Sequence, residues 1–197
     1  MEKSQNLLLR IENTKKGHLI NLRLLAKEYI QLVWDELCEE QMTSTTSLTD
    51  MEHNTVFHEA IWYASTEILP GLEIQVVIDD NWKLHISSGT AGFVGFPSEP
   101  AGLKIPIRCW IHTHPFGMAY FSSVDWRTIS IWGSLMDTAY VLGNRQYGYW
   151  VKDKPDELSI HTLPHNQFMG ENSLGEESIR IQLKEDGRDL PEPTGAM

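Results

Sequence analysis

The spacing of apolar residues predicts two amphipathic helices in the first third of the chain. From residue 17 to about residue 42, apolar side chains recur at the spacing of one helix face, at Leu22, Leu25, Tyr29, Leu32 and Val33. A second helix is predicted from Asn54, a typical N-cap, to Leu69, before Pro70 and Gly71, with an apolar face of Phe57, Ala60, Ile61, Ala64 and Ile68. The stretch TSTTSLTD between the helices has no periodicity, so residues 1–53 are predicted to be a helical extension and linker.

Short apolar runs separated by turn-forming residues predict strands after the second helix. The runs are LEIQVVID, KLHISS, FVGF and IPIRCWIH, followed further on by TAYVLG, YGYWVKD and ELSIHTL. Between the two groups, a helix is expected from Ser122 to about Met136, with Ile129, Trp132 and Met136 on one side. This order predicts an α/β sandwich around a mixed sheet over residues 54–165. Residues 166–197 are rich in charge, Gly and Pro, and we expect an acidic, mostly disordered tail.

Composition narrows the classes of function. The net charge of -11 and the scattered Lys and Arg residues argue against nucleic-acid binding, which needs a basic stripe. No apolar run approaches the roughly 20 residues that span a bilayer, and the N-terminus has no secretory signal pattern, so no membrane association is expected. The two cysteines, Cys38 and Cys109, are too few for a disulfide framework. We therefore expect a cytoplasmic protein.

The stretch CWIHTHPFGMAYFSSVDW, residues 109–126, gathers polar residues of the kinds that bind metals. Side chains two apart on a strand share a face, so His112 and His114 would present two imidazoles side by side. Asp125, at the start of the next helix, is a candidate third ligand. Three N and O ligands with one open position are typical of catalytic zinc. Ser122 is a candidate oxyanion donor, and a general base must be sought upstream, because the nearest acidic residue downstream is Asp137.

Simpler interpretations exist for the same residues. Ser122 and Asp125 have the spacing of a helix capping box, with Asp125 near the positive end of the helix dipole. His112 and His114, taken alone, are compatible with ordinary strand histidines. Their joint occurrence at one fixed spacing favours zinc binding over these alternatives.

That spacing, His-Thr-His, seven residues, Ser, two residues and Asp, with Pro115 after the second histidine, resembles the signature of the JAMM (MPN+) metalloprotease family. The resemblance covers residues 54–165. It implies a cytidine-deaminase-like sandwich, in which helices flank a curved mixed sheet, and zinc-dependent cleavage of isopeptide or peptide bonds at the C-terminus of ubiquitin or a ubiquitin-like protein. Carried over by position, His112, His114 and Asp125 would bind one Zn²⁺ and Ser122 would hold the oxyanion.

The resemblance also implies a catalytic glutamate on the first strand after the first helix of the domain. Glu73 occupies that setting, and Glu67 is the second choice. The strand EIQVVIDD departs from the family pattern because it lacks the glycine that usually follows the glutamate. Family members without a complete site act as scaffolds, and prokaryotic relatives process sulfur carriers or phage tails. A catalytically silent binding module and a peptidase with a non-ubiquitin substrate are therefore the alternatives.

Three further features carry weaker predictions. The loop after Pro115 cannot bury all of its large apolar residues, so one or two of Phe116, Met118, Tyr120 and Phe121 are expected to line a substrate channel. His161 and His165 are expected to be surface histidines, because no nearby cysteine completes a second zinc site. The N-terminal helix is expected to pack on its own domain or to bind a protein partner.

Overall fold

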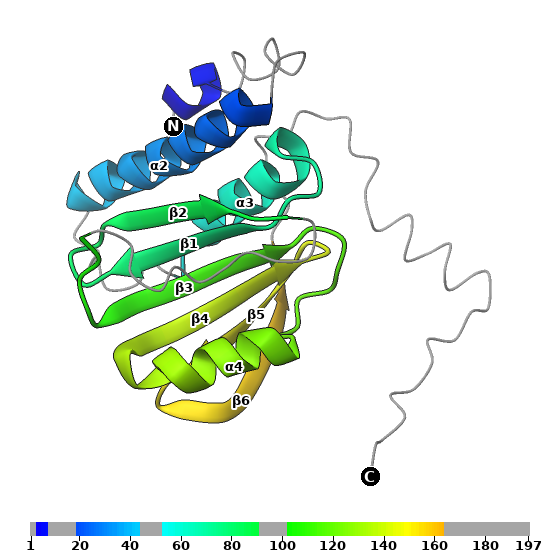
Figure 1. Cartoon of the computed structure of the whole chain (residues 1–197). Helices are drawn as coiled ribbons and strands as arrows, with labels where there is room; N and C mark the ends of the chain where they lie inside the picture. The colour runs from blue at the N-terminus through cyan, green and yellow to red at the C-terminus, as the bar shows by residue number, and fades with distance from the viewer. Residues whose placement is uncertain (1–2, 8–18, 44–52, 91–101, 164–197) are drawn as a thin grey trace. The chain divides into compact units, whose positions relative to one another are not determined.

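The computed structural model describes residues 3–7, 19–43, 53–90 and 102–163, which belong to one compact unit spanning residues 1–164. Its centre is a six-stranded sheet in the order β2-β1-β3-β4-β5-β6, with helices on both faces (Figure 1). The strands are β1 (Ile74–Asp79), β2 (Leu84–Ser88), β3 (Ile107–His114), β4 (Met136–Gly143), β5 (Gln146–Val151) and β6 (Lys154–Thr162). The pair β3–β4 is parallel and the other neighbours are antiparallel. The predicted α/β class with a mixed sheet is confirmed.

Alternation along the central strands gives the sheet two different apolar faces. Val76 and Ile111 belong to a core shared with helices α2 (Leu19–Thr43) and α3 (Thr55–Tyr63). Val77 and Trp110, one residue along each strand, belong to a second core that includes Ile129 of helix α4 (Ser123–Trp132). Because consecutive strand residues point to opposite faces, the parity of a residue in β1 or β3 decides which core it enters.

The predicted apolar face of the second helix is confirmed. Asn54 caps α3 by accepting hydrogen bonds from the backbone N–H groups of Val56 and Phe57. A π-helical turn, η2 (Ala64–Ile68), continues α3 and ends at Leu69. The five predicted face residues of this helix are all buried, namely Phe57, Ala60, Ile61, Ala64 and Ile68. The π turn at the end of this helix therefore leaves its apolar face buried.

Helix α2 packs on α3 and belongs to the same core. Trp34 of α2 is buried, with its ring centroid 4.7 Å from that of Phe57 and 6.4 Å from that of Trp82. Ile30 and Val33 lie on the same buried face, whereas Leu24 is largely exposed. The apolar residues of this helix are thus covered mainly by its own domain.

The helix predicted from Ser122 to Met136 is shorter in the structure. Ser122 is its N-cap, as predicted, but α4 ends at Trp132, and a 3₁₀ turn (Gly133–Leu135) leads into β4. Met136 is the first residue of β4 and pairs with Ile107 of β3, so its helical assignment was wrong. Met136 is buried in the same core as Ile129, and burial alone does not distinguish the end of a helix from the start of a strand.

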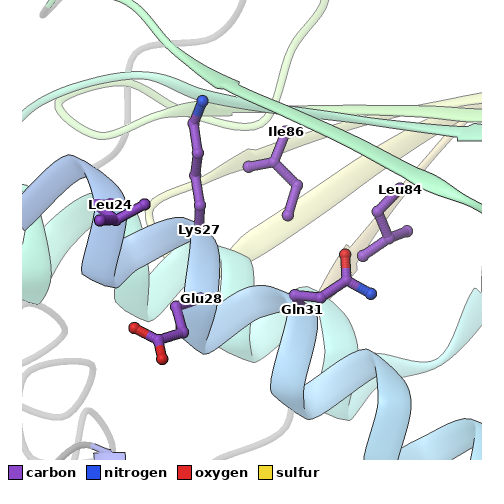
Figure 2. A pocket seen from close by; sticks show the side chains of 6 residues that line it. All are labelled: Leu24, Lys27, Glu28, Gln31, Leu84 and Ile86. Atoms are coloured by element: carbon purple, nitrogen blue, oxygen red, sulfur yellow. The ribbon is translucent and has the colours of Figure 1, made fainter. Parts of the chain in front are cut away.

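A groove of about 510 Å³ lies between α2 and β2, an outer strand of the described sheet (Figure 2). It is lined by Leu24, Lys27, Glu28, Gln31, Leu84 and Ile86. The groove contains none of the predicted site residues, and it is therefore separate from the chemistry predicted from the sequence.

Some predictions fall on residues that the structure does not describe. These are most of the linker TSTTSLTD, the strand FVGF at residues 93–96, the tail at residues 166–197 and His165. His161 is described and is exposed, with its ring stacked on Tyr147 and Tyr149. Within the described ranges, no helix combines the length and the apolar character that crossing a bilayer requires.

Candidate metal centre

Strand β3 places the two histidines of the motif on one face. His112 and His114 share the parity of Trp110 and lie on the α4 side, whereas Thr113 points to the opposite side. The chain then turns back, so that Asp125 in the first turn of α4 reaches the same place. One ligand atom from each of His112, His114 and Asp125 lies within 4.8 Å of the others. The structure thus brings together the three residues that the sequence singled out as ligands.

The Asp125 carboxylate divides its two oxygens between several partners. Oδ1 lies 3.2 Å from His112 Nε2, and Oδ2 lies 3.5 Å from His114 Nε2. Oδ2 also accepts a 2.7 Å hydrogen bond from the backbone N–H of Ser122, while Ser122 Oγ accepts from the backbone N–H of Asp125 at 3.3 Å. This is the capping box predicted from the sequence, and it fixes the carboxylate beside the histidines.

Burial and charge act against each other on the pKa values of these groups. Burial lowers the pKa of His112, because the charged imidazolium is disfavoured away from water, and Asp125 only partly offsets this. Burial also acts to lower the pKa of His114, but Asp125 and, more weakly, Glu73 outweigh it and raise the pKa. The pKa of Asp125 is lowered well below its usual range, because the two histidines and Ser122 outweigh the opposing effect of burial. These shifts favour an ionised Asp125 and a neutral His112, as metal ligation requires, whereas the raised pKa of His114 means that a bound metal would displace a proton from this imidazole.

The buried nitrogen of His112 tests whether this cluster fits a metal. His112 Nε2 is shielded from solvent and has no aligned hydrogen-bond partner among the described residues, even though Asp125 Oδ1 is 3.2 Å away. A buried polar atom without a partner is costly and calls for an explanation. A cation bound between His112, His114 and Asp125 would provide one. The three residues could therefore hold a metal ion.

Two residues that the sequence did not single out position His112. The indole ring of Trp110 stacks on the His112 ring, with centroids 4.5 Å apart and planes 13° apart. Trp110 Nε1 donates a 3.0 Å hydrogen bond to Gln75 Oε1, which fixes the indole in turn. Gln75 is paired with His112 across β1 and β3. The sequence offered one sign of this role for Gln75, because it is a polar residue within an otherwise apolar strand.

Glu73 lies immediately before β1, on the same face as the histidines. Because Gln75 pairs with His112 in antiparallel register, continuing the register by two residues brings Glu73 opposite His114. The Glu73 side chain is buried, and its negative charge raises the pKa of His114. Glu67, the second choice for the base, is exposed on η2. Of the two candidates, Glu73 is the one whose charge acts on a predicted ligand.

A chain of hydroxyl hydrogen bonds brackets Glu73 from the α3 side. The backbone N–H of Ile74 donates to Thr113 Oγ1 at 2.9 Å, and Ser65 Oγ donates to the Leu72 carbonyl at 2.7 Å. The Thr113 and Ser65 hydroxyls lie 2.8 Å apart. Because the Ser65 proton is used for Leu72, Thr113 is the donor between the two hydroxyls. The chain thus ties the residues before and after Glu73 to the middle of the His-Thr-His motif.

The loop after Pro115 presents apolar side chains beside the histidines. Phe116, Met118 and Tyr120 are more than half exposed, and the Tyr120 ring centroid is 5.6 Å from that of His114. Phe121 is buried. A Cβ at Gly143 would come within 2.5 Å of the Met118 backbone, so the close approach of this loop to the end of β4 requires glycine. Of the four apolar residues considered, three are therefore available at the surface around the site.

No protein-family model, curated protein or solved structure matches this chain. The resemblance to the JAMM family consequently rests on the motif residues themselves. The geometry described above is independent of that resemblance. It joins two histidines, an ionised carboxylate and a nearby buried glutamate on one face of the sheet.

Proposed function

We propose that the chain is a zinc-dependent peptidase of the JAMM type that removes ubiquitin or a ubiquitin-like modifier from a conjugate or a precursor. One observation carries the proposal. His112, His114 and Asp125 converge with one ligand atom each within 4.8 Å of the others, a donor set typical of catalytic zinc, and the buried Nε2 of His112 has Asp125 Oδ1 at 3.2 Å but no aligned hydrogen bond among the described residues. The substrate class is supported by the resemblance of the motif.

His112, His114 and Asp125 would hold the zinc, which when bound supplies positive charge to acidify a water molecule and to polarise the scissile carbonyl. Glu73 accepts a proton from the attacking water and delivers it to the leaving amine, so the peptide or isopeptide bond breaks with one water consumed. Ser122 Oγ uses a lone pair to cap α4, which leaves its own O–H proton available to donate to the developing oxyanion. Its cap role and its catalytic role are therefore compatible.

The exposed loop side chains suit an extended substrate tail. Phe116, Met118 and Tyr120 lie between His114 and Phe121 in the chain and are more than half exposed, and the Tyr120 ring lies beside His114. A flexible C-terminal tail with an apolar residue near the scissile bond would bury that residue here and gain orientation relative to Glu73.

Zinc binding is tested first, by elemental analysis of protein prepared without chelators. We expect about one zinc per chain and loss of zinc in His112→Ala. His161→Ala is the matched control, because His161 is an exposed histidine outside the site, and it should retain zinc. Protein that binds no zinc even when reconstituted with it would refute the proposal.

Catalysis is tested with a ubiquitin-like protein that carries a C-terminal fluorophore, with and without a chelator. Glu73→Gln should retain zinc and lose turnover, whereas Glu67→Gln, at the exposed glutamate, should retain both. If the two variants behave in the opposite way, Glu67 is the base. Zinc binding without cleavage of any ubiquitin-like substrate would favour a peptidase with another substrate or a silent scaffold.

A further inference from the structure

Arg23 of helix α2 reaches across to the end of β2. Its Nη1 donates hydrogen bonds of 2.9 Å to both the carbonyl and the hydroxyl oxygen of Ser88, and its Nη2 donates a 3.0 Å hydrogen bond to the Gly89 carbonyl. The side chain is half-buried, and it contacts residues that lie 65 and 66 positions away in the sequence. A guanidinium suits this task, because its planar fork carries donors on two separate nitrogens.

The segment that Arg23 holds is the one that binds the backbone of Glu73. The Gly89 N–H donates to the Glu73 carbonyl at 2.9 Å, and the Glu73 N–H donates to the Thr90 carbonyl at 2.9 Å. Glu73 precedes β1, so these two bonds lie just beyond the strand pairing proper. β2 is an outer strand of the described sheet, so the Ser88 carbonyl has no further described strand to pair with, and the guanidinium takes that place.

We propose that Arg23 is a positioning residue for Glu73, acting through the backbone of residues 88–90. The inference rests on the proposed function in one respect, namely that Glu73 is the general base. On one side of Glu73, Ser65 and Thr113 make hydrogen bonds to the residues just before and just after it. On the other side, Arg23 makes hydrogen bonds to the segment that pairs with the Glu73 backbone. Helix α2 then does more than cover the core, because it sets the position of a side chain at the metal site.

The test uses the full chain with zinc and compares three variants. Arg23→Met keeps the helix propensity and much of the apolar stem while removing all three hydrogen bonds. Arg23→Lys keeps the charge but cannot reproduce the two-nitrogen fork. Lys27→Met, one helical turn further on α2, is the matched control, because Lys27 is an exposed cation with no hydrogen bond to another residue in the described ranges.

Two kinds of readout separate positioning from a merely structural role. In Arg23→Met, the backbone amides of Glu73 and Gly89 should exchange with deuterium at least about tenfold faster, while the amide of Val77 in mid-strand exchanges as in the parent. Zinc content should stay at one per chain. The kcat should fall on the order of tenfold to a hundredfold with KM nearly unchanged, because misplacing a catalytic group lowers kcat. Arg23→Lys should lie in between, and Lys27→Met should match the parent throughout.

Each outcome decides something. Unchanged exchange at Glu73 and Gly89 overturns the proposal whether or not the protein is an enzyme. Faster exchange with an unchanged kcat, or with a change in KM alone, also overturns it, because Arg23 then holds the segment without positioning a base. If the parent protein cleaves nothing but exchange accelerates in Arg23→Met, the proposed function fails while the hold on the Glu73 backbone stands. If Arg23→Met does not fold, the comparison of Arg23→Lys with Lys27→Met decides by the same criteria.

Discussion

Thr113→Val tests whether the middle residue of the His-Thr-His motif is a structural link between β3 and the start of β1. Valine has nearly the volume of threonine and suits a strand, so the substitution removes a hydroxyl and little else. That hydroxyl is fully buried and accepts the N–H of Ile74, and it donates to Ser65. The imidazoles of His112 and His114 point to the other side of the strand, so the candidate ligands themselves are not altered.

The size of the effect follows from the group that loses its partner. In Thr113→Val, the buried N–H of Ile74 loses the acceptor shown by the structure, and a buried donor without a partner costs about 1–3 kcal/mol. Ser65 keeps its hydrogen bond to the Leu72 carbonyl, so its contribution to the loss is smaller. For a domain of this size, each 1 kcal/mol lowers Tm by about 2–4 °C, which gives an expected fall of roughly 2–12 °C.

The assay is thermal and denaturant unfolding followed by circular dichroism, on metal-free protein so that ligand binding does not contribute. Thr128→Val is the matched control, because the Thr128 hydroxyl donates a hydrogen bond to the Val124 carbonyl of its own helix at the surface. Its free energy of unfolding should change by less than about 0.5 kcal/mol. Should Thr113→Val be no less stable than Thr128→Val, the hydroxyl chain does not stabilise the link between β3 and the start of β1. Adding Ser65→Ala should give a non-additive double-mutant cycle, because the two hydroxyls share one network.

Two further predictions concern other buried polar groups. Trp110→Phe should weaken zinc binding by roughly tenfold or more, because it removes the hydrogen bond to Gln75 and part of the ring stacked on His112. Competition with a chelating dye measures the affinity for zinc. Trp150→Phe, in the same core, is the control and should leave that affinity unchanged. Burial acts to raise the pKa of Asp79, but four donors, His85 foremost, hold it below its usual value. Because the pKa of Asp79 is lower in the folded state, its charge stabilises the fold above the unfolded pKa of 3.8. Asp79→Asn should therefore be less stable than the parent at neutral pH. In urea unfolding, this difference in stability should shrink as the pH falls below 3.8. A difference independent of pH would mean that the Asp79 charge contributes nothing.

The sequence was most informative where local patterns suffice. The apolar run that contains IQVVID and the polar turn residues after it predicted β1, the run KLHISS predicted β2, and the N-caps Asn54 and Ser122 predicted the starts of α3 and α4. The spacing of the motif was enough to single out the three residues that the structure gathers into one cluster, because strand parity and a helix start fix their directions.

The residues that position the site were out of reach of the sequence for a physical reason. Arg23, Ser65 and Gln75 act through hydrogen bonds to segments that are distant in the chain, and these depend on which strands are neighbours. The parallel pairing of β3 with β4 and the outer place of β2 are tertiary facts that periodicity does not contain. The end of α4 was misplaced for the same reason, since Met136 is apolar and buried whether it ends a helix or begins a strand.

The two interpretations of Ser122 and Asp125 are complementary in the structure. A carboxylate has two oxygens and about four lone-pair directions, so Asp125 Oδ2 can accept the Ser122 N–H while Oδ1 stays directed toward His112. The capping box limits the rotamers open to Asp125, and the positive end of the α4 dipole favours the ionised form that a cation needs. The helix start therefore holds Asp125 in the position and charge state that a third metal ligand would need, and an N-cap that looks purely structural in the sequence becomes part of the reason that Asp125 could serve as one.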